Sequence, residues 1–156
     1  MTGVFKLQPY PDHPDRFNWP QVLCKEGLTG RCYWEVQWRV HVSIGVTYRG
    51  ITRSGNDCWL GYNNQSWSLT CSDDFYSAKH NREFTRISVR PRRSHRVAVY
   101  LDWSAGTVSF YRVSSDRLRL LHTFRSTFTE PLHPAFGVST SSPPSEVELP
   151  VCQKQL

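Results

Sequence analysis

The side chains that could bind a metal ion do not have the spacing that a metal site requires. The chain has five Cys and six His among 156 residues. A structural zinc site takes four such ligands, normally as pairs separated by roughly two to five residues. Cys24 and Cys32 are eight positions apart, and His80 and His95 are fifteen apart. We therefore expect no metal. The sequence also has no glycine-rich loop of the kind that holds the phosphates of a cofactor, so we expect no cofactor.

The residues that could act as nucleophile, base or acid are equally scattered. Segment 137–141 has the first glycine of a nucleophile elbow but not the second. Ser139, His80 and Asp102 could be combined into a triad only by chance, since no strand–turn–helix pattern surrounds the serine. The adjacent pair Asp73-Asp74 is more typical of a solvated turn, and Asp102 is placed to bind turn amides. The sequence therefore predicts a protein without enzymatic activity.

Basic side chains are the most concentrated chemical feature of the chain. Nineteen Lys and Arg against thirteen Asp and Glu give a net charge of +6 and a pI near 9.3. Six basic residues fall within eleven positions: Arg86, Arg90, Arg92, Arg93, His95 and Arg96. Three interpretations are open: a solvated loop, a contact for an acidic protein surface, and a contact for RNA phosphates. No aromatic residue that could stack on a base lies inside the cluster, which favours protein over RNA.

The cysteine count and the start of the chain bear on its location. Five cysteines are an odd number without a close pair, so we expect reduced, buried thiols rather than a disulfide framework. The first residues lack an apolar signal segment. No apolar run approaches the roughly 18 residues of a membrane-spanning helix, so no membrane insertion is expected. These features predict a cytoplasmic location.

The pattern of apolar residues indicates strands throughout. Apolar and polar residues alternate over 33–38, 40–46 and 97–103, and no segment has a helical period. Further strands are predicted near 21–25, 57–62, 66–71, 75–79, 83–89, 107–113, 117–124, 134–139 and 146–150. Many short strands separated by turn-forming residues predict an all-β fold, an antiparallel β-sandwich.

Particular aromatic and glycine residues have expected structural roles. Trp34 and Trp103 are predicted to lie in the core, because large aromatic residues on one strand face supply much buried area. Gly106 is predicted to take the left-handed conformation of a hairpin loop. The first twenty residues contain four prolines and suggest an extended strap, held to the sandwich by Phe17 and Trp19.

Several segments, in their order along the chain, resemble the PRY-SPRY domain. They are Pro11–Phe17, Gly30–Val36, Ser43–Val46 with Arg49–Ile51, Arg96–Trp103 with Ala105–Tyr111, and Phe128–Phe136. The sequence pattern of these segments is similar to that of the C-terminal module of fish-type tripartite-motif (TRIM) ubiquitin ligases and NACHT-leucine-rich-repeat receptors. Stonefish-type cytolysins carry a similar module.

The resemblance implies a fold and a division of the chain. The fold would be the SPRY-type, concanavalin-like jelly roll with a short PRY remnant. Residues 1–29 would form this remnant or strap, 30–150 the SPRY domain, and 151–156 a C-terminal tail. The early strand of the PRY half has no counterpart here.

The resemblance also implies that the chain binds a protein through variable loops at one end of the sandwich. Those loops would be 48–57, 70–81, 88–95 and 139–142. The candidate contact residues are Tyr48, Arg49, Arg53, Trp59, Thr70, Ser72, Phe75, Tyr76, Lys79, Arg92 and Thr140. Thr70, Ser72 and Thr140 stand where well-known members have aromatic contacts, so an antibody-Fc-type ligand is not expected.

The function expected from this resemblance is non-enzymatic protein recognition. The chain would be the substrate- or ligand-recognition end of a larger innate-immune or ubiquitin-ligase protein. Two alternatives stay open. One is an RNA-binding module that uses the cluster from Arg86 to Arg96, and the other is the C-terminal targeting module of a stonefish-type cytolysin.

Overall fold

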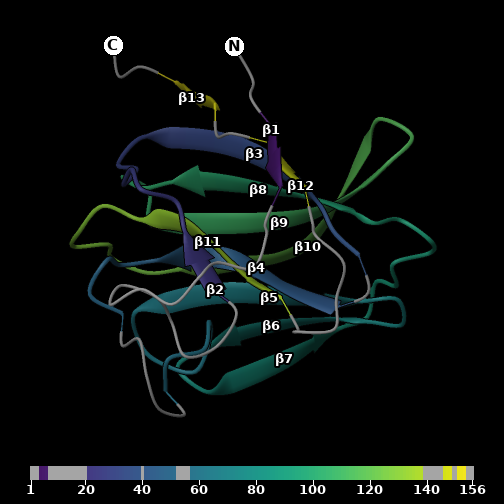
Figure 1. Cartoon of the computed structure of the whole chain (residues 1–156), viewed down its shortest axis with the longest axis horizontal. Coiled ribbons are helices and arrows are strands. Elements are labelled where there is room, and N and C mark those ends of the chain that lie inside the picture. Colours follow the sequence, from purple (N-terminus) through teal and green to yellow (C-terminus); the bar gives the residue numbers. More distant parts are fainter. Residues whose placement is uncertain are drawn as a thin grey trace.

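The chain forms strands connected by turns and loops in the computed structural model (Figure 1). The structure describes residues 4–6, 21–39, 41–51, 57–138, 146–148 and 151–153. The strands are β1 (Val4–Lys6), β2 (Gln21–Leu23), β3 (Arg31–Gln37), β4 (His41–Thr47), β5 (Ser66–Ser72), β6 (Tyr76–His80), β7 (Glu83–Ile87), β8 (Arg96–Asp102), β9 (Thr107–Ser114), β10 (Arg117–Arg125), β11 (His133–Val138), β12 (Glu146–Glu148) and β13 (Val151–Gln153). None of the described residues is in a helix, and so none forms a helix that could cross a membrane.

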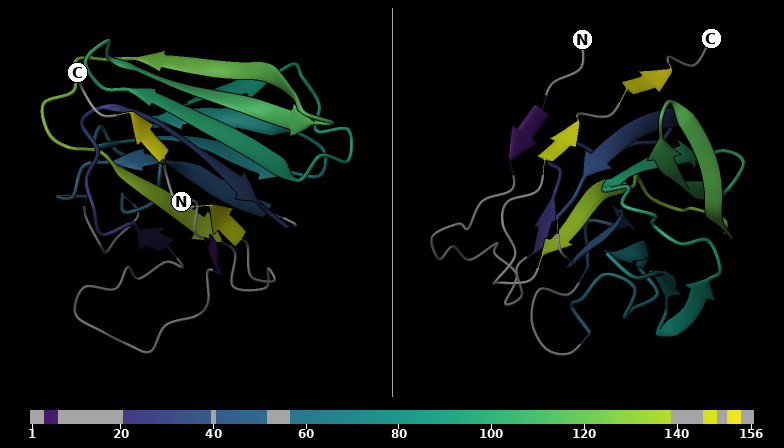
Figure 2. Two further views of the ribbon diagram at one scale, coloured as in Figure 1. Left: turned by 90° about the horizontal axis from the view of Figure 1, so that it is seen from above. Right: turned by 90° about the vertical axis from the view of Figure 1, so that its right-hand side faces the viewer.

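The strands form two sheets, seen as two layers in Figures 1 and 2. Sheet A has the order β1-β12-β3-β8-β9-β10, and β13 also pairs with β3. Sheet B has the order β2-β11-β4-β5-β6-β7. Every described pairing is antiparallel. The predicted antiparallel β-sandwich is confirmed. The predicted strap lies outside the described residues, apart from β1.

The core between the sheets follows from the alternation in the sequence. Trp34 and Val36 of β3 are buried, and so are Ile44 and Val46 of β4. These residues belong to one apolar cluster. The prediction that Trp34 is a core residue is confirmed. Trp103 is partly buried against the same cluster and donates its indole N–H to the Glu130 carbonyl at 2.8 Å.

The strand predicted at 57–62 is wrong, because this segment is folded around one asparagine side chain. Asn63 Nδ2 donates to the carbonyls of Asp57 at 2.8 Å and Trp59 at 3.3 Å. Its Oδ1 accepts from the Ser66 hydroxyl at 2.9 Å. These bonds satisfy the backbone as a loop, so no neighbouring strand is needed.

Two hairpin turns place ordinary residues in the left-handed region. Asn81 and Arg82 between β6 and β7 have φ of 48° and 64°, and Ser115 and Asp116 between β9 and β10 have the same values. Two consecutive positive φ values are the mark of a type I′ turn, whose twist matches that of paired strands. Gly106 has φ of 70°, as predicted.

Replacing Asp116 with glycine is expected to raise the free energy of unfolding by about 1 kcal/mol. A residue with a Cβ at φ of 64° is strained by about that amount, and glycine is not. Urea denaturation measures the change. Asp116→Ala is the control, since it removes the carboxylate and keeps the strain. Equal stabilisation by both variants would contradict the backbone explanation.

The cysteines differ from one another in state. Cys24, Cys58 and Cys71 are free thiols. Burial raises the pKa of Cys24 to about 11 and that of Cys71 well above its usual value, so both are protonated near neutral pH. Cys32 is disulfide-bonded, so the expectation of reduced thiols throughout is wrong at this position. The register of β13 on β3 places Cys152 opposite Cys32.

Candidate functional site

The loops expected to gather at one end of the sandwich leave it at opposite ends. Thr47, the last residue of β4, pairs with Ser66, the first residue of β5, so the described residues of the connecting loop, 48–51 and 57–65, lie at one end. The turn 73–75 between β5 and β6 lies at the other end, as does loop 88–95, because His95 Nε2 lies 2.9 Å from Asp73 Oδ1. Figure 1 shows the same division. The expected grouping at one end is therefore incorrect.

Of the candidates in the first loop, Tyr48 fastens it to the sandwich. Tyr48 is half-buried, its ring meets Trp67 edge-on at 5.4 Å, and its hydroxyl accepts from the Thr129 amide at 3.1 Å. Arg49 is exposed in the turn after β4. Arg53 and Thr140 lie outside the described residues.

Two further candidates are buried, which leaves their side chains unavailable to a partner. Tyr76 has no exposed surface and faces the core, where burial raises the pKa of its hydroxyl. Thr70 faces away from the core but is only 2% exposed, and its Oγ1 lies 3.3 Å from Ser43 Oγ. Their assignment as contact residues is thereby corrected.

All the remaining candidates except Arg92, which belongs to the basic cluster, share one surface on the side of sheet B that faces away from the core. Leu69 and Cys71 of β5 are core residues, so the residues between and after them point outward. Lys79 of β6 pairs with Phe84 of β7, which places both on this outer side. We call this surface the β5–β7 face. Its residues are Trp59, Tyr62, Ser72, Phe75, Lys79, Phe84 and Arg86.

Three aromatic rings and a cation form one half of the β5–β7 face. The ring centroids of Trp59 and Tyr62 are 4.9 Å apart, and those of Tyr62 and Phe84 are 5.4 Å apart. Lys79 Nζ lies 5.4 Å from the Tyr62 centroid and 5.1 Å from that of Phe84. Partial burial lowers the pKa of Lys79. Phe84 is 55% exposed and adjoins other rings, so this half of the face is an exposed apolar patch.

A second pair of a cation and a ring forms the other half. The Arg86 guanidinium lies 4.4 Å from the Phe75 centroid. Ser72 holds the adjoining turn, because its hydroxyl accepts from the Phe75 amide at 3.2 Å. Aromatic and arginine side chains are the types that dominate binding energy at protein interfaces.

The residues considered for catalysis have separate structural roles. His80 stacks on Trp67 with centroids 4.7 Å apart and donates from Nδ1 to the Ser66 carbonyl. Asp102 accepts from the Ala105 amide at 3.2 Å, which confirms its predicted role in the turn. Ser139 lies outside the described residues. Among the described residues no three His, Cys, Asp or Glu are placed to hold a metal ion.

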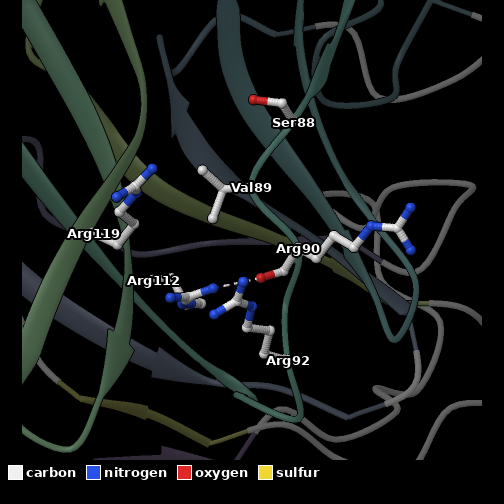
Figure 3. A pocket seen from close by; sticks show the side chains of 6 residues that line it. All are labelled: Ser88, Val89, Arg90, Arg92, Arg112 and Arg119. Carbon is white, nitrogen blue, oxygen red and sulfur yellow. Dashed lines mark hydrogen bonds between the residues drawn. The ribbon is translucent and has the colours of Figure 1, made fainter.

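The basic cluster is divided by the fold. Arg86 belongs to the β5–β7 face, and Arg96 Nη1 lies 3.2 Å from Glu35 Oε1. Arg90 and Arg92 line a cavity of about 330 Å³ together with Arg112 and Arg119 (Figure 3). Arg112 and Arg119, like Tyr62 and Phe84, are residues that sequence reasoning missed. The β9–β10 hairpin places the two arginines opposite each other, and folding brings Arg90 and Arg92 beside them.

A protein-family model and several known proteins match most of the chain. The model of the SPRY domain family matches residues 31–154. The alpha subunit of stonustoxin from Synanceia horrida is 42% identical over 137 residues, which are 85% of this chain and 20% of that protein. Tripartite motif-containing protein 16 from Mus musculus is 38% identical over 137 residues, 84% of this chain and 24% of that protein.

Solved structures agree with the sequence relatives. The stonustoxin structure superposes with a TM-score of 0.81 at 38% identity, over 91% of this chain and 24% of that one. The PSpry domain of TRIM65 superposes with a TM-score of 0.74 at 28% identity, over 90% of this chain and 73% of that one. The two antiparallel sheets form the β-sandwich that this family shares. The chain belongs to the SPRY domain family and is of the PRY-SPRY type found in TRIM proteins.

Proposed function

We propose that this chain is a protein-recognition module whose contact surface is the β5–β7 face. The observation that carries the proposal is the row of aromatic and cationic side chains on this face, with Phe84 more than half exposed. The rings of Trp59, Tyr62 and Phe84 pack on one another. Their side chains therefore lose little conformational entropy when a partner covers them. Membership of the SPRY family, a family of protein-interaction modules, supports the proposal.

The geometry favours a protein over RNA as the partner. The cluster proposed for RNA is divided between Arg86 on Phe75, Arg96 on Glu35 and the cavity arginines. On the β5–β7 face, Lys79 and Arg86 lie over ring faces that a base would need for stacking. The described residues therefore form no continuous basic surface next to aromatic rings that are free to stack on bases.

The proposed module would serve a larger protein. The chain spans about a fifth of the length of the toxin relatives and about a quarter of the tripartite-motif relative. We propose the recognition end of a ubiquitin-ligase or innate-immune protein, with any catalytic activity in other parts of that protein. A targeting module of a cytolysin is the second candidate, favoured by the 42% identity and the TM-score of 0.81 to stonustoxin.

The location of the parent protein remains a prediction. The free thiols of Cys24, Cys58 and Cys71 fit a cytoplasmic tripartite-motif protein. The disulfide at Cys32 favours an oxidising compartment instead, because disulfides are rare in the cytosol.

Photocrosslinking tests the proposed surface. A benzoylphenylalanine in place of Phe84 is expected to crosslink the chain to a partner polypeptide, and excess unmodified chain should abolish the product. The same probe in place of Leu118, which is 51% exposed on sheet A, is the matched control. Equal crosslinking from both positions, or from Leu118 alone, would contradict the proposal.

A further inference from the structure

Two paired arginines, Arg112 and Arg119, lie next to residues of the apolar core. The residues of β9 that face sheet B are Val108 and Phe110, both fully buried, and then Arg112 two positions further on. Its cross-strand partner on β10 is Arg119. Like charges directly opposite on neighbouring strands destabilise a sheet unless an opposite charge offsets them.

The described residues that line the cavity beside this pair include no acidic group. The cavity of about 330 Å³ is lined by Ser88, Val89, Arg90, Arg92, Arg112 and Arg119, and no carboxylate is among them. The ion pairs of the described part of the chain involve other residues: Arg82 with Asp57, His95 with Asp73, and Arg96 with Glu35. The positive charge of the cavity therefore has no counter-charge in the described residues.

The guanidinium of Arg112 is held in place but only partly satisfied. Its Nη1 donates to the Arg90 carbonyl at 2.6 Å. Its Nε is buried and has no partner among the described residues. Figure 3 shows Arg92 reaching toward the same carbonyl, while the Arg90 side chain turns away from the cavity. Arg112 is thus held in a fixed orientation at the cavity, and its unpaired Nε–H costs free energy because it is buried away from solvent.

We infer that this cavity binds a small phosphorylated ligand. Guanidinium groups donate in a planar fork that matches phosphate oxygens, and three of them here come from separate segments. A volume of about 330 Å³ is in the range of small-molecule sites and exceeds the space that one phosphate ion fills. The ligand is a compound with adjacent phosphates, either free or as the headgroup of a lipid.

This inference goes beyond the proposed function and does not depend on it. None of the residues that line the cavity belongs to the β5–β7 face. A chain that binds phosphate and no protein, or a protein and no phosphate, would separate the two proposals.

Titration of the chain with inorganic pyrophosphate tests the site. At about 0.05 M salt, where screening is weak, calorimetry is expected to show one bound pyrophosphate. Arg112→Gln and Arg119→Gln should each weaken binding at least about tenfold, which is about 1.4 kcal/mol. Arg125→Gln, at the far end of β10, makes the same change of charge and should leave the affinity unchanged.

The melting temperature without ligand gives a second readout. Because each variant removes one member of a like-charged pair, both should melt at or above the temperature of the unaltered chain and lose the stabilisation by pyrophosphate. Vesicles with a phosphorylated inositol headgroup distinguish the source: binding that pyrophosphate displaces indicates a lipid, and pyrophosphate binding without vesicle binding indicates a free compound.

Three results would overturn the inference. Pyrophosphate at millimolar concentration could produce neither heat nor a rise in melting temperature. Arg125→Gln could weaken binding as much as Arg112→Gln, which would show a general effect of charge. RNA could bind at the arginines without competition from pyrophosphate, which would assign the cavity to a nucleic acid instead.

Discussion

Replacing Trp34 with alanine is expected to lower the free energy of unfolding by about 3–5 kcal/mol. The Trp34 side chain is 1% exposed, lies in the middle of β3 and belongs to the main core cluster. Its removal leaves a large cavity that the surrounding strands cannot close. Because a domain of this size has only about 5–15 kcal/mol of stability, chemical denaturation should show a greatly reduced midpoint.

Trp34→Phe is the matched control for this experiment. The phenyl ring keeps much of the buried apolar area and removes an indole N–H that has no partner among the described residues. We expect a clearly smaller loss than for alanine. A loss below about 1 kcal/mol for Trp34→Ala would place the residue outside the rigid core and contradict the described packing.

Replacing Gly45 with alanine is expected to cost about 3 kcal/mol, at the upper end of what added core atoms usually cost. A Cβ at this position of β4 would overlap the Trp67 carbonyl oxygen and would lie 2.8 Å from Ser68 Cα. Both atoms belong to the backbone of the paired strand β5, so no side-chain rotation can relieve the contact. The β4–β5 pairing would have to shift.

Gly50→Ala separates steric overlap from a general effect of removing glycine. A Cβ there meets nothing within 4 Å, so its free energy of unfolding should stay the same or rise by about 0.5 kcal/mol. Denaturation of both variants under the same conditions measures the difference. Similar stabilities for the two variants would show that β4 and β5 do not approach as closely as described.

The fold was predictable from sequence because its strands are half-buried. In β3 and β4, apolar residues alternate with polar ones, and the apolar residues are buried. The failure at 57–62 has a physical reason. Cys58 and Leu60 are buried in a small second cluster, so the segment has the alternation of a strand, while Asn63 supplies the bonds that make it a loop.

The candidate site was predictable only in part, because alternation does not say which face of a strand is covered. Tyr76 and Lys79 were both proposed as contacts, yet Tyr76 faces the core and Lys79 the outer side. Phe84 is of a residue type that is usually buried in the core, but it lies exposed on strand β7. The local β9–β10 hairpin pairs Arg112 with Arg119, but no local pattern reveals that Arg90 and Arg92 join them at the cavity.

The central claim is that the β5–β7 face binds a protein. The most direct test is to measure the Kd of the chain and its variants for the crosslinked partner. Phe84→Ser is expected to raise the Kd at least about tenfold, the loss of about 1.4 kcal/mol typical of an important interface residue. Leu118→Ser, which removes a similarly exposed apolar side chain from sheet A, should leave the Kd unchanged. An unchanged Kd for Phe84→Ser, or an equal rise for Leu118→Ser, would contradict the claim.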